Sequence, residues 1–200
     1  MAAPAESPSR LAIVIPLKAF AAAKDRLSSA LSPAQRAALA TRLATRVLTI
    51  ARTIEGADII VASDDDEVLA WSNTFGAIGV RQSRPGLNGA VSDARDEARH
   101  RGCDHVLITH GDLVDPTSLV ELCATLDRTV VTLVSDRHLD GTNVLALPTS
   151  IDFDTHYGKG SFRAHLDEAT RRGIAAHVVE DARLALDVDE PADLDLLTES

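Results

Sequence analysis

Lysine is scarce in this chain, and two of its three lysines share one loop. Lys18 and Lys24 follow the apolar run at 11–17, and Arg26 comes two residues after Lys24. The loop has neither a Walker pattern nor a Gly-x-Gly-x-x-Gly pattern, so side chains must supply most phosphate contacts. Cationic side chains bind phosphate oxygens, and this spacing predicts a polyphosphate-binding loop. A solvated basic loop is the alternative, and the spacing alone does not separate the two.

Three aspartates follow predicted strands and form the candidate metal site. Asp112 comes just beyond the strand at 105–109, and Asp187 and Asp189 follow an apolar segment near the end of the chain. In an extended Asp-x-Asp the two side chains point the same way, and carboxylate oxygens are ligands that Mg²⁺ prefers. We therefore predict Mg²⁺ here. The alternative is a turn with solvated acids; a competing acidic run at 64–66 is interpreted as a helix cap.

Two small polar turns are further candidates for anion binding. Lys159 lies between Gly158 and Gly160, and a predicted helix follows with Ser161 as its N-cap. Free amide groups at a helix N-terminus bind anions, and glycine permits the turn. The turn at 141–143 has a similar composition. For each of these turns, ordinary turn chemistry is the alternative. The sequence has no nucleophile elbow and no evident Ser-His-Asp order.

The elements that must position these residues follow an α/β pattern of short apolar runs and longer amphipathic stretches. We expect one domain at 11–200, with a mostly parallel, partly mixed central sheet flanked by helices, after a disordered leader at 1–10. Strands are expected at 11–17, 58–62, 79–82, 105–109, 129–134, 143–147 and 175–179. Helices are expected after a Ser32 capping box and at 65–75, 90–100, 117–127, 161–172 and 191–197. The short connection at 136–142 makes the fifth and sixth strands antiparallel.

Composition excludes several classes of function. The net charge is -10 and aromatic residues make up 3%, which argues against a nucleic-acid partner. No apolar stretch approaches the roughly 18 residues of a membrane span, so no membrane partner is expected. Two cysteines without metal spacing indicate a reducing compartment, and we expect a cytoplasmic protein.

Taken together, the motifs carry a resemblance to a known family. They lie at 16–18, 23–27, 31–33, 85–88, 136–138, 140–143, 158–162 with His165, and 186–189 with Pro191. The chain resembles, from about 11 to 197, the 2-phospho-L-lactate guanylyltransferase family of coenzyme F(420) biosynthesis. The resemblance implies a Rossmann-like, glycosyltransferase-A-like nucleotidyltransferase fold. It also implies transfer of GMP from GTP to a small phosphorylated carboxylic acid, with release of pyrophosphate.

The resemblance also implies roles for individual residues. Asp112, Asp187 and Asp189 match the family's metal ligands, and Thr142, Gly158 and Ser161 match its acceptor-binding positions. The triphosphate and catalytic positions are Lys18, Lys24 and Arg26, and the nucleotide-binding positions are Pro16, Leu17, Lys18, Lys24, Pro85 and Asn88. A downstream transferase that takes the product is an expected partner.

The acceptor is left open by the motifs. Family members use 2-phospho-L-lactate, phosphoenolpyruvate or 3-phospho-D-glycerate. His110 and Asp115 depart from the family's Ala-Asp-Leu-Pro pattern around Asp112. Their polar groups favour 3-phospho-D-glycerate weakly, because of its extra hydroxyl. A nucleotidyltransferase for a pterin or a sugar phosphate, and an inactive nucleotide-binding regulatory module, are the alternative functions.

Overall fold

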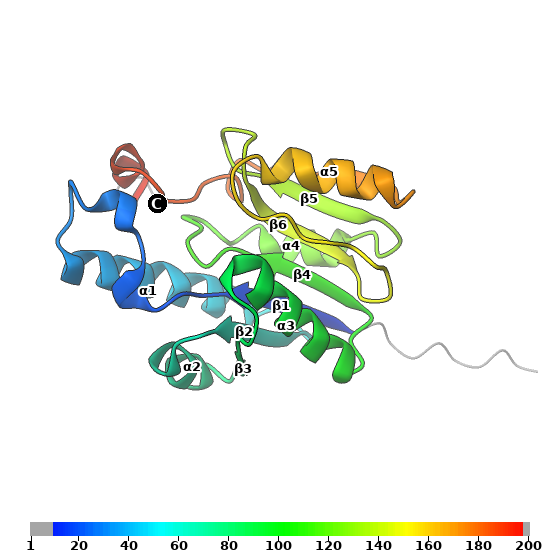
Figure 1. Cartoon of the computed structure of the whole chain (residues 1–200), viewed down its shortest axis with the longest axis horizontal. Helices are drawn as coiled ribbons and strands as arrows, with labels where there is room; N and C mark the ends of the chain where they lie inside the picture. Colours follow the sequence, from blue (N-terminus) through cyan, green and yellow to red (C-terminus); the bar gives the residue numbers. More distant parts are fainter. Residues whose placement is uncertain (1–9, 198–200) are drawn as a thin grey trace, which may run out of the picture.

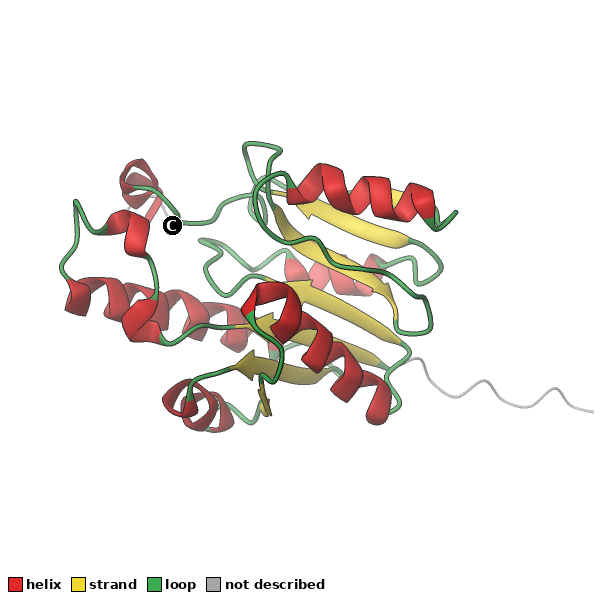
Figure 2. Ribbon diagram, in the orientation of Figure 1, coloured by secondary structure: helices red, strands yellow, loops and turns green. Residues whose placement is uncertain are grey.

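The computed structural model describes residues 10–197 and contains a seven-stranded sheet with helices on both faces (Figure 1, Figure 2). The strand order is β3-β2-β1-β4-β6-β5-β7. The strands are β1 (Leu11–Pro16), β2 (Asp58–Ser63), β3 (Ile78–Arg81), β4 (His105–Thr109), β5 (Val131–Ser135), β6 (Thr142–Pro148) and β7 (Ala176–Val178). Of the predicted leader, residues 1–9 lie outside the described part of the chain.

The sheet is mostly parallel and partly mixed, as predicted. β1 pairs in parallel with β2 and β4, β2 with β3, and β5 with β7. β6 is antiparallel to both β4 and β5, which confirms the prediction for the fifth and sixth strands. The helices are α1 (Pro33–Ala51), α2 (Asp66–Asn73), α3 (Gly86–His100), α4 (Leu119–Thr125) and α5 (Ser161–Arg171). Three 3-10 helices are η1 (Phe20–Ala22), η2 (Asp25–Leu27) and η3 (Pro191–Leu197).

Burial of β1 on both faces explains its nearly continuous apolar sequence. Ile13 and Ile15 belong to a core cluster that includes residues of α1, α2 and α4. Ala12 and Val14 belong to the opposite cluster, which includes residues of α3 and α5. Successive side chains of a strand point to opposite faces, so one short strand contributes to two cores.

Local signals placed most helix ends correctly, but two glycine-containing turns were misjudged. Ser32 accepts from the amide of Gln35, and the Gln35 side chain accepts from the amide of Ser32, which confirms the capping box. α3 begins at Gly86, four residues before the predicted start at 90, because Gly86 adopts a φ of +75° and turns the chain directly into the helix. Ser161 is the first residue of α5, and Gly160 is its N-cap. The predicted closing helix is the 3-10 helix η3.

The order of the strands brings the candidate residues to one edge of the sheet. β1 has β2 on one side and β4 on the other, and ligands of open α/β sheets bind at such a switch point, beyond the carboxyl ends of the strands. The segment at 17–31 leaves β1 there, and the segment at 110–115 leaves β4 there. A third apolar cluster, with Leu27, Val114 and Val188 among its members, joins both segments to the last part of the chain. In Figure 1, η3 accordingly lies beside the early loop.

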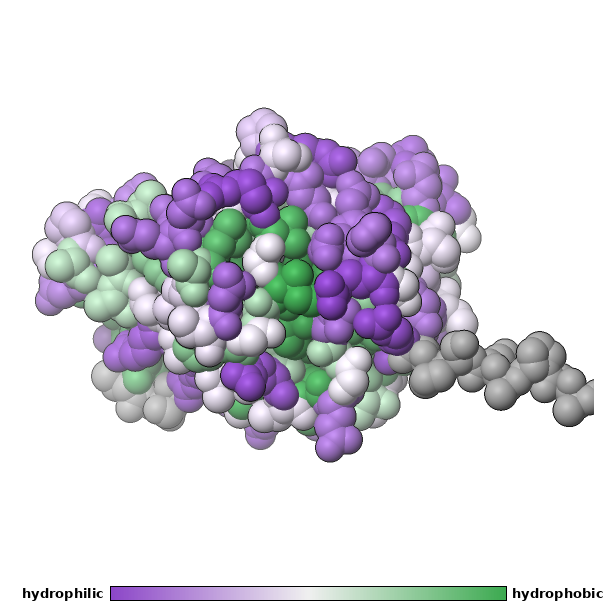
Figure 3. All heavy atoms as spheres, turned by 90° about the horizontal axis from the view of Figure 1, so that it is seen from below, coloured by the Kyte–Doolittle hydropathy of each residue, from purple (hydrophilic) through white to green (hydrophobic). Residues whose placement is uncertain are grey.

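The surface of the described residues is mixed in polarity. One face has a central band of hydrophobic residues with hydrophilic residues around it (Figure 3). Large exposed hydrophobic side chains among residues 10–197 are Val120, Leu139 and Val178. Within the same residues, no helix is both long and apolar enough to cross a lipid bilayer.

Candidate active site

Lys24 is the charged centre of the site, because its ammonium group contacts two loops that are distant in sequence. Its side chain is 7% exposed, and Nζ donates to Asp112 Oδ2 and to the Val188 carbonyl, at 2.5 Å each. A longer contact of 3.4 Å reaches Asp189 Oδ1. The backbone of Lys24 is left-handed, with a φ of 60°, which non-glycine residues rarely adopt. Such strain is typical of positions where a functional group must be held in place.

Asp112 and Asp189 contact this ammonium group, and the charges of both act on the third predicted carboxylate, Asp187. Burial, together with the negative charges of Asp112 and Asp189, raises the pKa of Asp187 to about 6. Burial also opposes ionisation of Asp112, but Lys24 and then His110 hold the pKa of Asp112 below its usual value. Burial acts against the charge of Lys24 as well, yet its carboxylate partners raise the pKa of its ammonium group. The cluster therefore carries more negative charge than Lys24 alone neutralises.

Backbone pairing brings the carboxylates together. Leu113 and Asp187 form an isolated antiparallel bridge, and the amide of Val114 donates to the carbonyl of Leu186 at 2.9 Å. Gly111 makes this path possible, because a Cβ at that position would lie 2.3 Å from a side-chain carbon of Leu17. The segment after β4 thus runs beside the segment at 186–188, and Asp112 approaches Asp187 as predicted.

Two further residues hold the carboxylate loops: Asn143, which was predicted only as part of a small polar turn, and Asp193, which had no predicted role. Asn143 Nδ2 donates to the Leu184 carbonyl at 3.0 Å and lies 3.5 Å from Asp187 Oδ1. The buried carboxylate of Asp193 accepts from the amides of Asp189 and Glu190, at 2.8 and 2.7 Å. Asn143 belongs to a motif that was noted for its turn composition, whereas the sequence gives no signal that separates Asp193 from other acids.

The donor set of the cluster fits a hard divalent cation. Asp112, Asp187 and Asp189 offer carboxylate oxygens, and Asp112 Oδ1 is buried without a hydrogen-bond partner among the described residues. Lys24 lies between two of these carboxylates. Across residues 10–197, no group of three or more His, Cys, Asp or Glu side chains is already arranged to hold a metal. Cation binding would therefore require the contacts of Lys24 to change.

The uncharged part of the site lies at the start of β6 and of α5. Thr142 and Ser161 are buried, and Ser161 Oγ donates to Thr142 Oγ1 at 3.4 Å. Gly158 has a φ of +134°, a value that favours glycine, and the chain turns there before α5. The amide of Ser161 donates to the carbonyl of Gly158, and that of Phe162 to the carbonyl of Asp140. Two amides of the predicted anion site thus already have partners.

Histidine and tyrosine rings connect the two parts of the site. The His110 ring lies 5.6 Å from the Tyr157 ring, and the Tyr157 ring lies 4.9 Å from the His165 ring, between centroids. His110 Nδ1 is 4.0 Å from Asp112 Oδ1, and its Nε2 is buried without a partner among residues 10–197. His110 therefore does lie beside the carboxylates. Asp115 instead accepts hydrogen bonds from the amide and hydroxyl of Thr117.

Other predicted residues lie at the margin of the cluster. Arg26 is 72% exposed and approaches Asp189 at 3.5 Å, and Lys18 is exposed on the same early loop. Pro16 ends β1, and Leu17 follows it, donating its amide to the Ala62 carbonyl.

The nucleotide-side residues of the 85–88 segment have partners within the chain. Pro85 precedes α3, and Asn88 lies in its first turn. The Asn88 side chain accepts from the Tyr157 amide and donates to the Tyr157 carbonyl, so it links α3 to the segment before α5.

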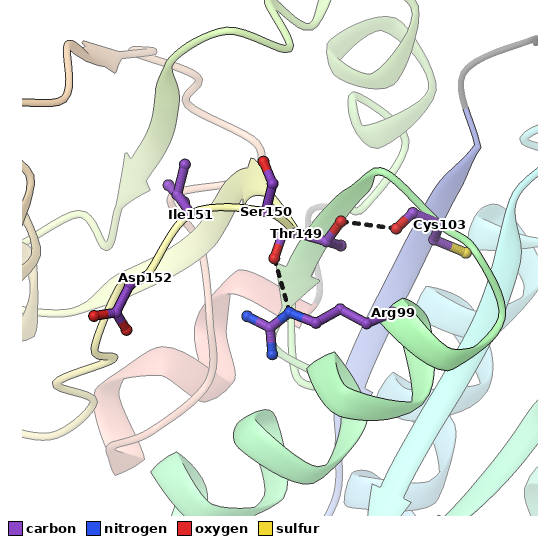
Figure 4. Close-up of a pocket in the computed structure, with 6 residues that line it drawn as sticks. All are labelled: Arg99, Cys103, Thr149, Ser150, Ile151 and Asp152. Carbon is purple, nitrogen blue, oxygen red and sulfur yellow. Dashed lines mark hydrogen bonds between the residues drawn. The ribbon is translucent and has the colours of Figure 1, made fainter.

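Two cavities lie elsewhere, beside α3. The first, of about 490 Å³, is lined by Arg99, Cys103 and the segment at 149–152 (Figure 4). Arg99 donates to the Thr149 carbonyl, and Thr149 donates to the Cys103 carbonyl. The second, of about 450 Å³, continues along α3 to Asn88. Neither is lined by Lys24 or the carboxylates, and the first lies near the amino end of β4.

Comparison with solved structures shows which fold the chain has. A proposed nucleotide-diphospho-sugar transferase from Desulfovibrio desulfuricans superposes with a TM-score of 0.78, at 18% identity, covering 94% of this chain and 86% of that one. A CMP:2-keto-3-deoxy-manno-octonic acid synthetase in complex with CTP gives a TM-score of 0.58 at 15% identity, covering 96% of this chain and 98% of that one. At such identities the likeness concerns the fold alone. The chain has the glycosyltransferase-A-like fold of nucleotidyltransferases.

Sequence comparison then places the chain in one family. The family described as "Guanylyl transferase CofC like" matches residues 11–198. A phosphoenolpyruvate guanylyltransferase from Sphaerobacter thermophilus is 36% identical over 187 residues, which are 92% of this chain and 90% of that protein. A 2-phospho-L-lactate guanylyltransferase from Methanocaldococcus fervens is 28% identical, over 91% of this chain and 82% of that protein. The chain belongs to the CofC-like guanylyl transferase family, as its motifs predicted.

Proposed function

We propose that this protein transfers GMP from GTP to phosphoenolpyruvate and releases pyrophosphate, as a step of coenzyme F(420) biosynthesis. Family membership supports the guanylyl transfer, and the 36% identity to a phosphoenolpyruvate guanylyltransferase supports this acceptor. 2-Phospho-L-lactate is the second candidate, supported by a relative at 28% identity. These relatives give no support to the weak preference for 3-phospho-D-glycerate.

The observation that carries the proposal is the convergence of Lys24 with Asp112 and Asp189, beside the buried hydroxyl groups of Thr142 and Ser161. The charged part suits a triphosphate, with Lys18 and Arg26 as further contacts on the early loop. The hydroxyl part, with Gly158, suits a small anionic acceptor, because hydroxyl and amide groups donate to carboxylate and phosphate oxygens.

The chemistry requires no general base within the protein. A phosphate oxygen of the acceptor attacks the α-phosphorus of GTP, the bond between the α-phosphorus and its bridging oxygen breaks, and pyrophosphate leaves with that electron pair. The attacking phosphate is already ionised at neutral pH, so no proton has to be removed from it. Lys24 orients the triphosphate and stabilises the charge of the leaving group. A Mg²⁺ ion held by Asp112, Asp187 and Asp189 would add neutralisation of phosphate charge.

A substrate panel tests the proposal directly. Pyrophosphate release is measured with GTP and each of phosphoenolpyruvate, 2-phospho-L-lactate and 3-phospho-D-glycerate, with CTP as the matched nucleotide control. We expect the highest kcat/KM with GTP and phosphoenolpyruvate. Release only with a pterin or a sugar phosphate would move the protein to another acceptor class. GTP binding without any pyrophosphate release would support the inactive regulatory module instead.

Metal binding has its own test, which does not depend on turnover. Mg²⁺ is titrated against the wild-type protein and against Asp187→Asn, and the melting temperature is followed without nucleotide. We expect Mg²⁺ to raise the melting temperature of the wild type and to have a smaller effect on the variant. Equal shifts in both proteins would contradict the assignment of Asp187 as a ligand.

A cytoplasmic location and a downstream transferase that accepts the product belong to the same proposal.

A further inference from the structure

His165 is a buried histidine whose two ring nitrogens both have partners beside the predicted acceptor site. Its side chain lies on α5, and the residue is 0% exposed. The backbone amide of His156 donates to Nε2 at 2.9 Å, and Nδ1 lies 3.0 Å from Thr142 Oγ1. The ring therefore joins three separate parts of the chain: α5, the segment that precedes it, and the first residue of β6.

These two contacts determine which nitrogen carries the proton. An amide N–H can only donate, so Nε2 must accept and cannot hold a hydrogen. A neutral imidazole with an unprotonated Nε2 carries its hydrogen on Nδ1. Burial, together with the neighbouring His156 and His110, lowers the pKa of His165 to about 4, which agrees with a neutral ring. His165 Nδ1–H thus donates to the hydroxyl oxygen of Thr142.

The direction of this hydrogen bond decides what Thr142 can offer to a ligand. Thr142 Oγ1 accepts from His165 and, at 3.4 Å, from the hydroxyl of Ser161. With both lone pairs in use, the Thr142 hydroxyl can act only as a donor. Among residues 10–197 the structure shows no acceptor for its proton. An anionic acceptor substrate requires such donors.

We propose that His165 is a positioning residue that makes the Thr142 hydroxyl a hydrogen-bond donor to the carboxylate or phosphate of the acceptor. The inference rests on the proposed function, because the acceptor is taken to bind at Thr142 and Ser161. His165 itself does not touch the substrate. It acts on affinity for the acceptor through Thr142, and the nucleotide end of the site is expected to be unaffected.

Two substitutions distinguish the roles of the two ring nitrogens of His165. In His165→Asn, the side-chain amide can still donate from the place of Nδ1 to Thr142, but the His156 amide loses its acceptor. In His165→Gln, the side-chain oxygen can accept from the His156 amide, but the donor to Thr142 is lost. His105→Asn is the matched control, since His105 is equally buried at 1% exposure, on β4 at the end remote from the site.

The readout is the KM for phosphoenolpyruvate against the KM for GTP. We expect His165→Gln to raise the acceptor KM about 10-fold or more, the loss typical of one hydrogen bond to a charged group, with the GTP KM within about twofold. His165→Asn should stay within about threefold of wild type, and His105→Asn should change neither KM. The proposal is overturned if His165→Gln and His165→Asn behave alike, or if both KM values move together.

A measurement on the wild-type protein covers the case in which a variant fails to fold. Nitrogen-15 NMR of histidine-labelled protein at pH 7 reports which ring nitrogen is protonated. We expect His165 to carry its proton on Nδ1, and a proton on Nε2 would overturn the proposal. This result does not depend on the proposed function. If the wild type uses no phospho-acid, the proposed function fails, whatever tautomer His165 adopts.

Discussion

The two parts of the candidate site are held together by different forces. The carboxylate part depends on charge, with Lys24 bonded across 88 residues to Asp112 and across 165 residues to Asp189. The hydroxyl part depends on neutral hydrogen bonds between Thr142, Ser161 and His165, all of them buried. The charged cluster has surplus negative charge and is favourable only while a cation neutralises it. The neutral network keeps its hydrogen bonds without a ligand, and among residues 10–197 it leaves only the proton of the Thr142 hydroxyl without an acceptor. The charged part is therefore expected to change partners when ligands bind, and the neutral part to be preformed.

The largest effect is expected from removing one negative charge of the carboxylate part. Asp112→Asn should lower kcat/KM by about 10³-fold or more, because the site then loses a carboxylate proposed to hold Mg²⁺ at the triphosphate. The melting temperature should fall less than in Lys24→Gln, because the new amide oxygen can still accept from Lys24 and the substitution relieves repulsion with Asp187. Steady-state kinetics with GTP and phosphoenolpyruvate measure this.

Asp115→Asn is the control for Asp112→Asn. Asp115 lies on the same loop, but its carboxylate accepts hydrogen bonds from Thr117 and not from Lys24. The kcat/KM of Asp115→Asn should therefore stay within about twofold of the wild-type value. Turnover by Asp112→Asn near the wild-type rate at saturating Mg²⁺ would show that the charged part is not the reaction centre.

The next effect concerns the cation of the same cluster. Lys24→Gln should lower the free energy of unfolding by about 3 kcal/mol, because it removes a buried ammonium group and leaves the largely buried Asp112 carboxylate without its cation. The double variant Lys24→Gln with Asp112→Asn should recover part of that loss. Urea unfolding at pH 7 measures the free energy of unfolding of each variant relative to the wild type. Arg26→Gln is the control, and a change within about 0.5 kcal/mol is expected, since its pair with Asp189 is exposed. Equal losses of unfolding free energy in Lys24→Gln and Arg26→Gln would contradict the conclusion that Lys24, and not Arg26, stabilises the cluster.

A smaller effect is expected in the neutral part. Thr142→Val should raise the KM for phosphoenolpyruvate about tenfold and leave the KM for GTP unchanged, because a donor to the acceptor is lost while the volume is kept. Thr132→Val is the matched control: Thr132 is a buried β5 residue whose hydroxyl has no partner among residues 10–197. It should change neither KM. A rise in the KM for GTP in Thr142→Val would place Thr142 on the nucleotide side.

The smallest effect is a pH dependence of stability from the two buried histidines. Burial lowers the pKa of both His105 and His165 to about 4, from a usual 6.5. The pKa of each histidine is lower in the folded protein than in the unfolded chain. The contribution of the neutral rings to the free energy of unfolding is therefore complete above pH 6.5 and is lost as the pH falls toward 4. For each histidine, the free energy of unfolding should fall by about 1 kcal/mol when the pH is lowered from 6.5 to 5.5. Urea unfolding at both pH values should show a shallower loss in His105→Asn, and parallel losses would contradict the assignment.

Local patterns allowed much of the fold to be predicted. The strand at 105–109 was predicted with its observed bounds, and the Ser32 capping box was found as expected. Both depend on neighbouring residues: the strand shows as a short apolar run, and the capping box forms by reciprocal hydrogen bonds within one turn. The third helix was predicted to begin at 90, but α3 already begins at Gly86, with Pro85 as its N-cap. Glycine is compatible with a turn or a helix, and tertiary contacts decide between them: Gly89 is buried so close to Arg84 that a Cβ would lie 2.3 Å from the Arg84 carbonyl oxygen, and Ala90 belongs to the core cluster of Ala12 and Val14.

For the site, the sequence by itself determined which kinds of side chain follow which strands: a basic loop after β1, an aspartate after β4, and an Asp-x-Asp near the end. It did not determine that Lys24 bonds to both acidic segments, that Asp193 holds the backbone of Asp189, or that His165 joins His156 to Thr142. The tertiary structure decided those pairings. Residue type and spacing act over a few positions, whereas burial and partnership depend on the order in which the strands lie side by side, and that order brings distant segments together at one edge of the sheet.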